Sequence, residues 1–483
     1  MLNFRPIFLV NGTLLLILSV AMLVPAILDY MAQNDSWHGF IAAAFATAFT
    51  GSALVLTNRG YKGRNLNLRQ AFILTTSSWL VLVTFSSLPF VLSDKSISFS
   101  DAFFESMSGL TTTGATVINN LDTRPIGILL WRSILQWLGG IGIIVMAMAV
   151  LPMLKIGGMQ LFRTESSDNA DKVLPRATQI SGAITGLYAS LTILCGFCLW
   201  IAGMDVFDAV NHAMTTMATS GFSTHDDSIA FFDSLSIEVV MIIFMIVSGI
   251  PFVLYIQLVQ GRPQPLLQDS QVRWFLTLLA LSVVSTAFWL YLTQDMTWQH
   301  ALRLSSFNIV SVTTTTGFST ADYDQWGSFP IVFVFLLAVV GGCTGSTTGG
   351  IKIFRYQVLY EIAKSQVNQL VQPHGIFRPT FNGKPISDVA IGSVLSFFIL
   401  FAFFFSVLAI LLSWTGLDYI TSMSAAGSMM ANLGPGLGDV IGPSGNYSSL
   451  SDAAKWLCSI GMLVGRLEIF TVLILFSPYF WRS

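Results

Sequence analysis

Thr112-Thr113-Gly114-Ala115 is a short polar turn within sequence that is hydrophobic enough to lie in a membrane, and three similar turns follow it. They are Thr219-Ser220-Gly221-Phe222, Thr315-Thr316-Gly317-Phe318 and Asn432-Leu433-Gly434-Pro435, at intervals of roughly a hundred residues. Irregular backbone at membrane depth is tolerated only where protein buries it or where it lines a watery cavity. Four such turns around one axis would surround a pore with backbone carbonyl groups, as ion filters do.

The composition is that of an integral membrane protein. Of the 483 residues, 53% are hydrophobic and only 10% are charged, and the mean hydropathy is +0.70. Soluble domains carry about 25% charged residues, and about 20 apolar residues cross a bilayer as a helix. Apolar runs of that length predict ten spans. They lie near 7–28, 37–57, 70–92, 126–151, 182–203, 236–259, 273–293, 391–414 and 454–478, with a tenth, interrupted run near 328–363.

The charges predict an orientation. Most of the 23 Lys and Arg residues fall in segments that ten spans would place on one side, and most of the 25 Asp and Glu residues fall on the other. Because cytoplasmic loops of membrane proteins are rich in Lys and Arg, both termini are expected in the cytoplasm. The acidic outer face should concentrate cations.

After two leading spans, one pattern occurs four times: a span, a short amphipathic helix, a polar turn and a second span. The short helices are expected near 99–111, 205–218, 299–312 and 418–430. Asp101, Asp205 or Asp208, and Asp418 stand near three of the helix starts, where a carboxylate accepts free backbone N–H groups. The partially negative C-terminus of each helix then points to the pore axis and favours a cation there.

The expected fold is therefore an all-α integral membrane protein with ten spans and four re-entrant pore helices. Residues 1–69 hold the two leading helices and a cytoplasmic loop, and residues 70–181 hold the first pore repeat with a cytoplasmic linker. The second, third and fourth repeats follow at 182–272, 273–388 and 389–483.

The polar turns supply the candidate filter residues. Glycine reaches positive φ without a Cβ clash, which allows successive carbonyls to face one axis, and Thr hydroxyls can ligate an ion or brace the backbone. Neutral oxygens suit a monovalent ion, whereas a carboxylate would favour divalent ions. An alternative is that these small residues only allow close helix packing. The candidates are Thr112, Thr113, Gly114, Thr219, Ser220, Gly221, Thr315, Thr316, Gly317, Asn432, Leu433 and Gly434.

Glycines break the helix at 341–350, since each costs a helix about 1 kcal/mol. The broken stretch is the candidate gate because it resembles the intramembrane loop that blocks the pore below the filter in a known family of potassium transporters. A nucleotide-binding loop is excluded because Ile351 separates Gly350 from Lys352. Arg466 lies inside the last predicted span, where a charge is expensive and usually functional. It could form an electrostatic barrier or tie down carbonyls of the broken helix, and Lys352 is a conceivable partner. The alternative for the glycines is a packing kink. The candidate gate residues are Gly345, Ser346, Thr347, Thr348, Gly349, Lys352 and Arg466.

These turns resemble the filters of the Trk/Ktr/HKT superfamily of potassium transporters, and the arrangement of spans resembles its TrkH/TrkG (TrkI-like) group. The resemblance implies a homodimer with one pore per subunit, in a bacterial inner membrane. It also implies a cytosolic, nucleotide-binding TrkA-type partner that gates the pore. A serine in place of the first filter glycine is associated with sodium preference in this superfamily, so Gly114 implies potassium.

The leading hypothesis is potassium uptake through a selective, gated pore, with potassium as the transported ion and no tightly bound organic cofactor. A sodium- or proton-coupled symporter on the same fold is the alternative. A membrane-embedded enzyme would need a paired nucleophile and base or a metal cluster, and the sequence shows neither. Membrane lipid surrounds the chain, and no nucleic-acid partner is expected.

Overall fold

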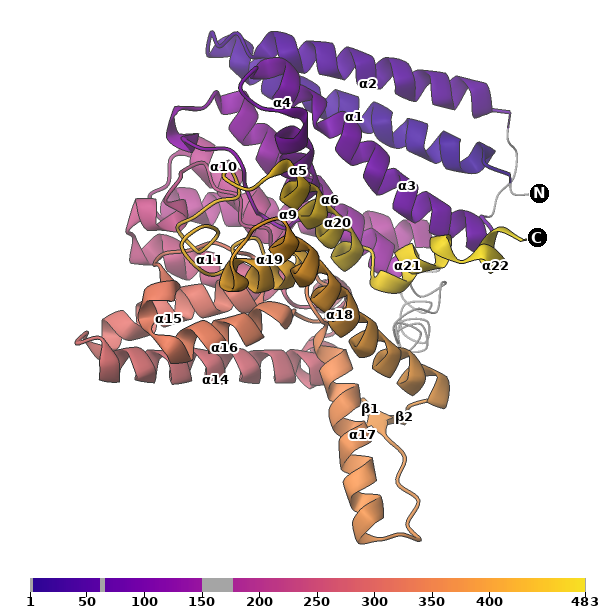
Figure 1. Cartoon of the computed structure of the whole chain (residues 1–483), viewed down its shortest axis with the longest axis vertical. Helices are drawn as coiled ribbons and strands as arrows, with labels where there is room; N and C mark the ends of the chain where they lie inside the picture. The colour runs from indigo at the N-terminus through magenta and orange to yellow at the C-terminus, as the bar shows by residue number, and fades with distance from the viewer. Residues whose placement is uncertain (1–2, 61–65, 150–176, 483) are drawn as a thin grey trace.

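The structure is a computed structural model that describes residues 3–60, 66–149 and 177–482. Nearly all of its regular structure is helical (Figure 1). The predicted cytoplasmic linker before residue 181 lies almost entirely outside the described residues.

Two leading helices, α1 (Arg5–Met31) and α2 (Trp37–Asn58), pack closely along each other. Their contact depends on two facing glycines, because a Cβ on Gly12 would lie 2.9 Å from the carbonyl oxygen of Gly51, and the reverse contact is equally short. The fully buried Asp29 at the end of α1 accepts a hydrogen bond of 2.8 Å from the backbone N–H of Gly127. The leading pair is thereby attached to the first repeat.

Four repeats follow in chain order. The first has α3 (Leu68–Ser86), α4 (Leu88–Ser93), α5 (Phe99–Leu110), η1 (Leu121–Thr123) and α6 (Ile126–Ala149). The second has α9 (Ala177–Ile201), α10 (Val206–Met217), η2 (Ser228–Phe232), α11 (Leu235–Ser248) and α12 (Phe252–Val259), followed by the short α13 (Gln264–Gln268). The third has α14 (Ser270–Thr293), α15 (Trp298–Thr313), η3 (Tyr323–Trp326), α16 (Ser328–Val339) and α17 (Ile353–Val371). After the hairpin β1 (Thr380–Phe381) and β2 (Lys384–Pro385), the fourth has α18 (Asp388–Trp414), α19 (Tyr419–Ala431), α20 (Asp452–Arg466), α21 (Ile469–Leu473), η4 (Ile474–Phe476) and α22 (Pro478–Trp481).

Among the described residues, seven helices are long and apolar enough to cross a membrane, or up to nine spans if two bent pairs are counted. The spans predicted near 236–259 and 454–478 are bent and are not single straight helices. The first breaks by 96° between α11 and α12, where Gly249 and Pro251 interrupt the helix, and the second breaks by 109° before α21. The interrupted run near 328–363 consists of α16, the Gly-rich loop and α17.

The four short helices α5, α10, α15 and α19 match the predicted pore helices to within two residues. Asp205 and Asp418 are N-caps, as expected, because their carboxylates accept backbone N–H groups of the first turn. Asp101 is not a cap; Ser98 caps α5, and the Asp101 carboxylate instead accepts a hydrogen bond of 2.6 Å from Lys455.

Figure 1 shows that α17 and the β1–β2 hairpin extend away from the rest of the helices, while the two chain ends lie on the same side. A hydrogen bond of 3.0 Å from the Arg69 guanidinium to the carbonyl of Arg482 joins the start of α3 to the C-terminal segment. The α17 helix directly follows the Gly-rich loop, so it connects the centre of the molecule to its outermost part.

Candidate ion filter and gate

Each pore helix ends in the same hydrogen-bonded turn. In the first repeat, the N–H of Thr112 bonds to the carbonyl of Gly109 at 3.0 Å, and the N–H of Thr113 bonds to that of Ser108 at 2.8 Å. The same pair of bonds closes the other three helices. This Schellman motif requires one left-handed residue, which is usually glycine. Here that position is occupied by Thr112, Thr219, Thr315 and Asn432, with φ between 49° and 54°.

A β-branched residue at positive φ is uncommon and points to a functional constraint on its side chain. Two residues later, each turn reaches positive φ a second time, at its glycine. In all four repeats, the first residue of the turn and its glycine therefore have positive φ, whereas the residue between them does not. The values at Gly114, Gly221, Gly317 and Gly434 are 83°, 77°, 86° and 106°.

The four turns form a closed ring in chain order. A Cβ on Gly114 would lie 1.9 Å from the carbonyl oxygen of Ser220, the residue before the next filter glycine. The corresponding distances are 2.2 Å from Gly221 to Thr316 and 2.2 Å from Gly317 to Leu433. Gly434 closes the ring with 2.6 Å to Thr113 of the first repeat. Each glycine is thus required both by its own φ and by the carbonyl of its neighbour.

The hydroxyl groups of the turns have different roles. Thr113 and Thr316 brace the filter, because their Oγ1 atoms pair with Thr111 at 2.8 Å and Thr314 at 2.7 Å respectively. The amide of Asn432 donates to Thr113 Oγ1 at 3.0 Å, which ties the fourth turn to the first. Within the described residues, the buried Thr112 Oγ1 has no hydrogen-bond partner.

The Gly-rich loop 341–350 packs directly against this ring. Its Gly349 donates a backbone hydrogen bond of 2.7 Å to Thr315 Oγ1, and Thr219 Oγ1 donates one of 3.2 Å to Thr347 Oγ1. Gly350 donates to the carbonyl of Ala431 at 2.8 Å. The loop therefore contacts the second, third and fourth turns at the ends of their pore helices.

The same loop completes the broken span between α11 and α12. Residues at a helix break have free backbone groups that membrane interiors cannot leave unpaired. Cys343 donates to the carbonyl of Gly249 at 3.0 Å, Thr347 donates to that of Ser248 at 3.3 Å, and Phe252 donates to that of Gly345 at 3.0 Å. The break in the second repeat and the loop of the third are one packed unit.

Arg466, at the end of α20, donates a hydrogen bond of 3.1 Å to the carbonyl of Thr347. Lys352 does not pair with it; its ammonium group donates to the carbonyl of Thr348, to Thr348 Oγ1 at 3.1 Å and to the carbonyl of Gly349 at 3.3 Å. Two cations thus hold the loop by its carbonyl oxygens.

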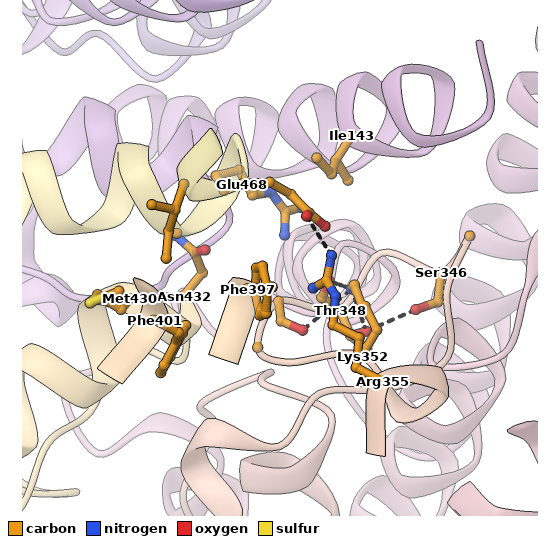
Figure 2. A pocket seen from close by; sticks show the side chains of 16 residues that line it. Ile143, Ser346, Thr348, Lys352, Arg355, Phe397, Phe401, Met430, Asn432 and Glu468 are labelled. Carbon is orange, nitrogen blue, oxygen red and sulfur yellow. Dashed lines mark hydrogen bonds and ion pairs between the residues drawn. The ribbon is translucent and has the colours of Figure 1, made fainter. Parts of the chain in front are cut away.

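A cavity lies beside these contacts (Figure 2). The volume of the cavity is about 40 Å³, which is room for roughly two or three waters or a monovalent cation. Its wall combines the loop with the end of the fourth pore helix and parts of α18 and α20. Among the lining residues are Ser346, Thr348, Lys352, Asn432 and Arg466.

Comparison with known proteins identifies the family of this chain. A family model described as "TrkH: Cation transport protein" matches residues 38–483. The chain belongs to the TrkH family. It is 42% identical to the Trk system potassium uptake protein TrkI of Halomonas elongata, over 100% of this chain and 98% of that one. It is 37% identical to Escherichia coli TrkH over the full length of both. The crystal structure of the potassium transporter TrkH from Vibrio parahaemolyticus matches with a TM-score of 0.92 at 37% identity, covering 100% of both chains.

The chain is accordingly a multi-pass membrane protein of a cation transport family, and the TrkH fold expected from the sequence is confirmed. The structure brings the candidate filter residues together in one ring. Of the candidate gate residues, Thr347 and Gly349 bond to this ring, and Arg466 and Lys352 bond to the loop that carries them.

Sequence reasoning did not find the side chains that brace this candidate filter of a TrkH-family chain from behind. Gln136 of α6 accepts hydrogen bonds from Ser220 Oγ at 2.7 Å and from the N–H of Phe222 at 3.1 Å, and it donates to the carbonyl of Ser220 at 2.9 Å. One amide therefore holds both ends of the second turn. A polar residue at a core-facing position of an apolar span was the available signal.

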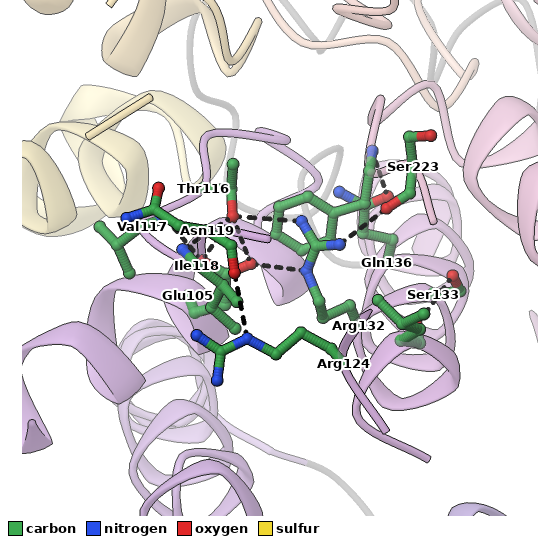
Figure 3. Close-up of polar contacts among 12 residues, drawn as sticks. Glu105, Thr116, Val117, Ile118, Asn119, Arg124, Arg132, Ser133, Gln136 and Ser223 are labelled. Atoms are coloured by element: carbon green, nitrogen blue, oxygen red, sulfur yellow. Dashed lines mark hydrogen bonds and ion pairs between the residues drawn. The ribbon is translucent and has the colours of Figure 1, made fainter. Parts of the chain in front are cut away.

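The buried ion pair Arg132–Glu105 is the second brace (Figure 3). Their side chains are 1% and 0% exposed and lie 2.7 Å apart. Glu105 accepts the N–H of Val117 at 2.9 Å, and Arg132 donates to the carbonyl of Ser223 at 2.8 Å. The pair thus joins the segments that directly follow the first and second turns.

In the loop after the second turn, His225 lies between two carboxylates, with Nδ1 2.5 Å from Asp122 and Nε2 3.1 Å from Asp208. Burial lowers the pKa of His225, but the hydrogen bonds and charges of Asp208 and Asp122 outweigh burial, so the pKa is raised above its usual value. The contact joins the loop after the first turn to the second repeat.

The His225 contacts should make stability depend on pH. A raised pKa contributes stability that is complete below the ordinary pKa of about 6.5 and is lost as the pH rises through the higher folded value. Between pH 6 and pH 8.5 the melting temperature should fall by about 1 to 2 °C more than in His225→Gln. The exposed His374, substituted in the same way, should leave the wild-type pH profile unchanged. Parallel profiles for the wild type and His225→Gln would contradict this assignment.

Shortening the loop should open the gate. Deleting Ser346-Thr347-Thr348 removes the acceptor for Arg466, both Thr348 acceptors for Lys352 and the contact with Thr219. Basal potassium flux into liposomes is expected to rise by roughly tenfold or more, the scale of common conformational couplings. Deleting Pro373-His374-Gly375, between α17 and β1, is the matched control. A folded loop-deletion variant with wild-type flux would show that the loop is a packing kink and not a gate.

Proposed function

We propose that this protein conducts potassium into the bacterial cell through the ring of four turns. The observation that carries the proposal is the closed ring, in which each filter glycine lies against the carbonyl preceding the next one. The turns offer only neutral oxygen groups, which suit a weakly held monovalent cation that must enter and leave. The relatives named above are potassium uptake proteins and a potassium transporter.

The half-helix arrangement supports cation conduction independently of those names. The four pore helices end at the ring, so their partially negative C-termini all face the proposed ion path. Below it, the loop and the cation Arg466 stand at the ends of the same helices. Conduction therefore requires the loop to move, and the resting structure is a closed state.

The proposed oligomeric state, membrane and regulatory partner follow from the resemblance of the four turns to the Trk/Ktr/HKT superfamily. The protein is a homodimer in the inner membrane with both termini in the cytoplasm, and a cytosolic, nucleotide-binding TrkA-type subunit controls its gate. The extended α17 and the β1–β2 hairpin offer an exposed segment for such a subunit, since Leu370 and Ile376 are 82% and 87% exposed.

Flux measurements on the purified protein in liposomes test the proposal. Potassium uptake is expected to exceed sodium uptake and to persist without a pH or sodium gradient. Uptake that requires either gradient would establish the coupled symporter instead. Equal uptake of both ions through a folded protein would overturn the assignment of the ring as a potassium filter.

A further inference from the structure

The backbone of Glu468, where α20 breaks from α21, has an unusual conformation. Its φ of 61° and ψ of 130° lie in a region that residues with a side chain rarely occupy. Such a residue costs of order 1–3 kcal/mol and persists only where its surroundings impose it. Here it accompanies a bend of 109° that begins two residues after Arg466. The position of the gate cation thus depends on a strained bend.

One side chain reaches this bend from another repeat. Arg355, in the first turn of α17, forms an ion pair with the Glu468 carboxylate, and the two side chains are only 1% and 10% exposed. The Arg355 guanidinium also lies 3.6 Å from the ring centroid of Phe397 on α18. Figure 2 shows Arg355 and Glu468 pointing toward each other at the cavity below the filter. A buried, fixed pair of this kind is well suited to hold a particular backbone arrangement.

The pair connects the two segments that flank the gate. Arg355 is five residues after Gly350, at the end of the loop, and Glu468 is two residues after Arg466, which holds the loop at Thr347. The helix that carries Arg355 is the one that extends away from the rest of the chain. A displacement of α17 would therefore act on the bend and on Arg466 through one contact.

We propose that Arg355 and Glu468 form a latch that holds the α20–α21 bend and so keeps Arg466 on the closed loop. The two are positioning residues, since they act on the ion path through Arg466 and the loop. Movement of α17 releases the latch, allows the strained bend to relax and withdraws Arg466 from Thr347. The inference rests on the proposed conduction pore and specifies how its closed state is maintained.

Two substitutions at one position separate a latch from an ordinary buried ion pair. Glu468→Ala removes the carboxylate and leaves the strained φ, whereas Glu468→Gly removes the carboxylate and relieves the strain. If the pair holds the bend, alanine should raise basal potassium flux in liposomes by roughly tenfold, and glycine should raise it clearly less. If the pair only neutralises buried charges, both variants leave Arg355 without this partner, and they should show equal flux and equal thermal destabilisation.

Further variants keep the test decisive if Glu468→Ala folds poorly. Arg355→Lys retains a positive charge and should leak less than Arg355→Gln. Glu238→Gln breaks another ion pair outside the gate, in which the carboxylate is buried and lies 2.7 Å from the partly exposed Arg303, and should leave basal flux unchanged. Equal flux in the alanine and glycine variants, or in the Lys and Gln variants, overturns the latch. Liposomes that contain the wild-type protein serve as the reference in the same experiment. If they take up potassium, equal flux in the variants overturns only the latch; if they do not, the proposed function itself fails.

Discussion

Replacing Gly114 with serine is expected to lower the potassium-to-sodium permeability ratio by about tenfold or more, the scale on which one added group changes discrimination in a fitted site. The new Cβ would lie 1.9 Å from the carbonyl oxygen of Ser220, so that the carbonyl must move. The residue must also keep a φ of 83°, which a side chain disfavours. The first and second turns would therefore separate or rotate, and the ring would lose its fit to potassium.

Permeability ratios from liposome flux or bilayer recordings measure this effect. Gly392→Ser is the matched control, because Gly392 lies on α18 with no atom within 4 Å of an added Cβ. It should retain the wild-type ratio. A folded Gly114→Ser protein with the wild-type ratio would show that selectivity does not arise at this ring.

Removing the charge at Arg466 is the second change with a large expected effect. Arg466→Ala deletes both a cation next to the proposed ion path and the hydrogen bond of 3.1 Å to Thr347. Hydrogen bonds to charged groups contribute about 1.5–3 kcal/mol, so basal potassium flux should rise by roughly tenfold or more. Arg466→Lys keeps the positive charge but loses the planar set of donors. Its flux should stay within about threefold of the wild type if charge repulsion forms most of the barrier.

Flux and thermal stability measured together distinguish the two roles of Arg466. Equal flux in the Ala and Lys variants, with stability lowered in both, would mean that the residue acts only as a clamp on the loop. Arg466→Lys leaves the ion pair between Arg355 and Glu468 in place, so the backbone bend at Glu468 should be unchanged. Comparison with the Arg355 variants therefore separates the cation from the latch that positions it.

Local sequence was sufficient for the elements that form the pore. The pore helices were predictable because their starts carry capping residues such as Asp205 and Asp418 and their ends carry a polar turn with glycine. The four turns that meet in the ring were predictable because a turn of this kind at membrane depth has few structural uses. Arg466 was predictable for a similar reason, since a charge inside an apolar span is costly.

Contacts between distant segments could not be obtained in this way. The bend at Glu468 occurs at a residue with no helix-breaking tendency, because Arg355, more than a hundred residues earlier, binds its carboxylate. The break between α11 and α12 likewise depends on a loop from the next repeat to pair its backbone groups. Lys352 holds carbonyls of its own loop and not Arg466, for which the sequence had offered it as a conceivable partner.

The sequence by itself determined that this chain spans a membrane, repeats one unit four times and places a glycine turn at the end of each pore helix, because hydrophobic length, capping and glycine stereochemistry act over a few residues. Only the tertiary structure decided that the four turns close in chain order, that Gln136 and the Arg132–Glu105 pair support them, and that Arg466 bonds to the loop while Glu468 pairs with Arg355. The physical reason is that a buried carbonyl or charge must find a partner, and the fold determines which distant residue supplies it.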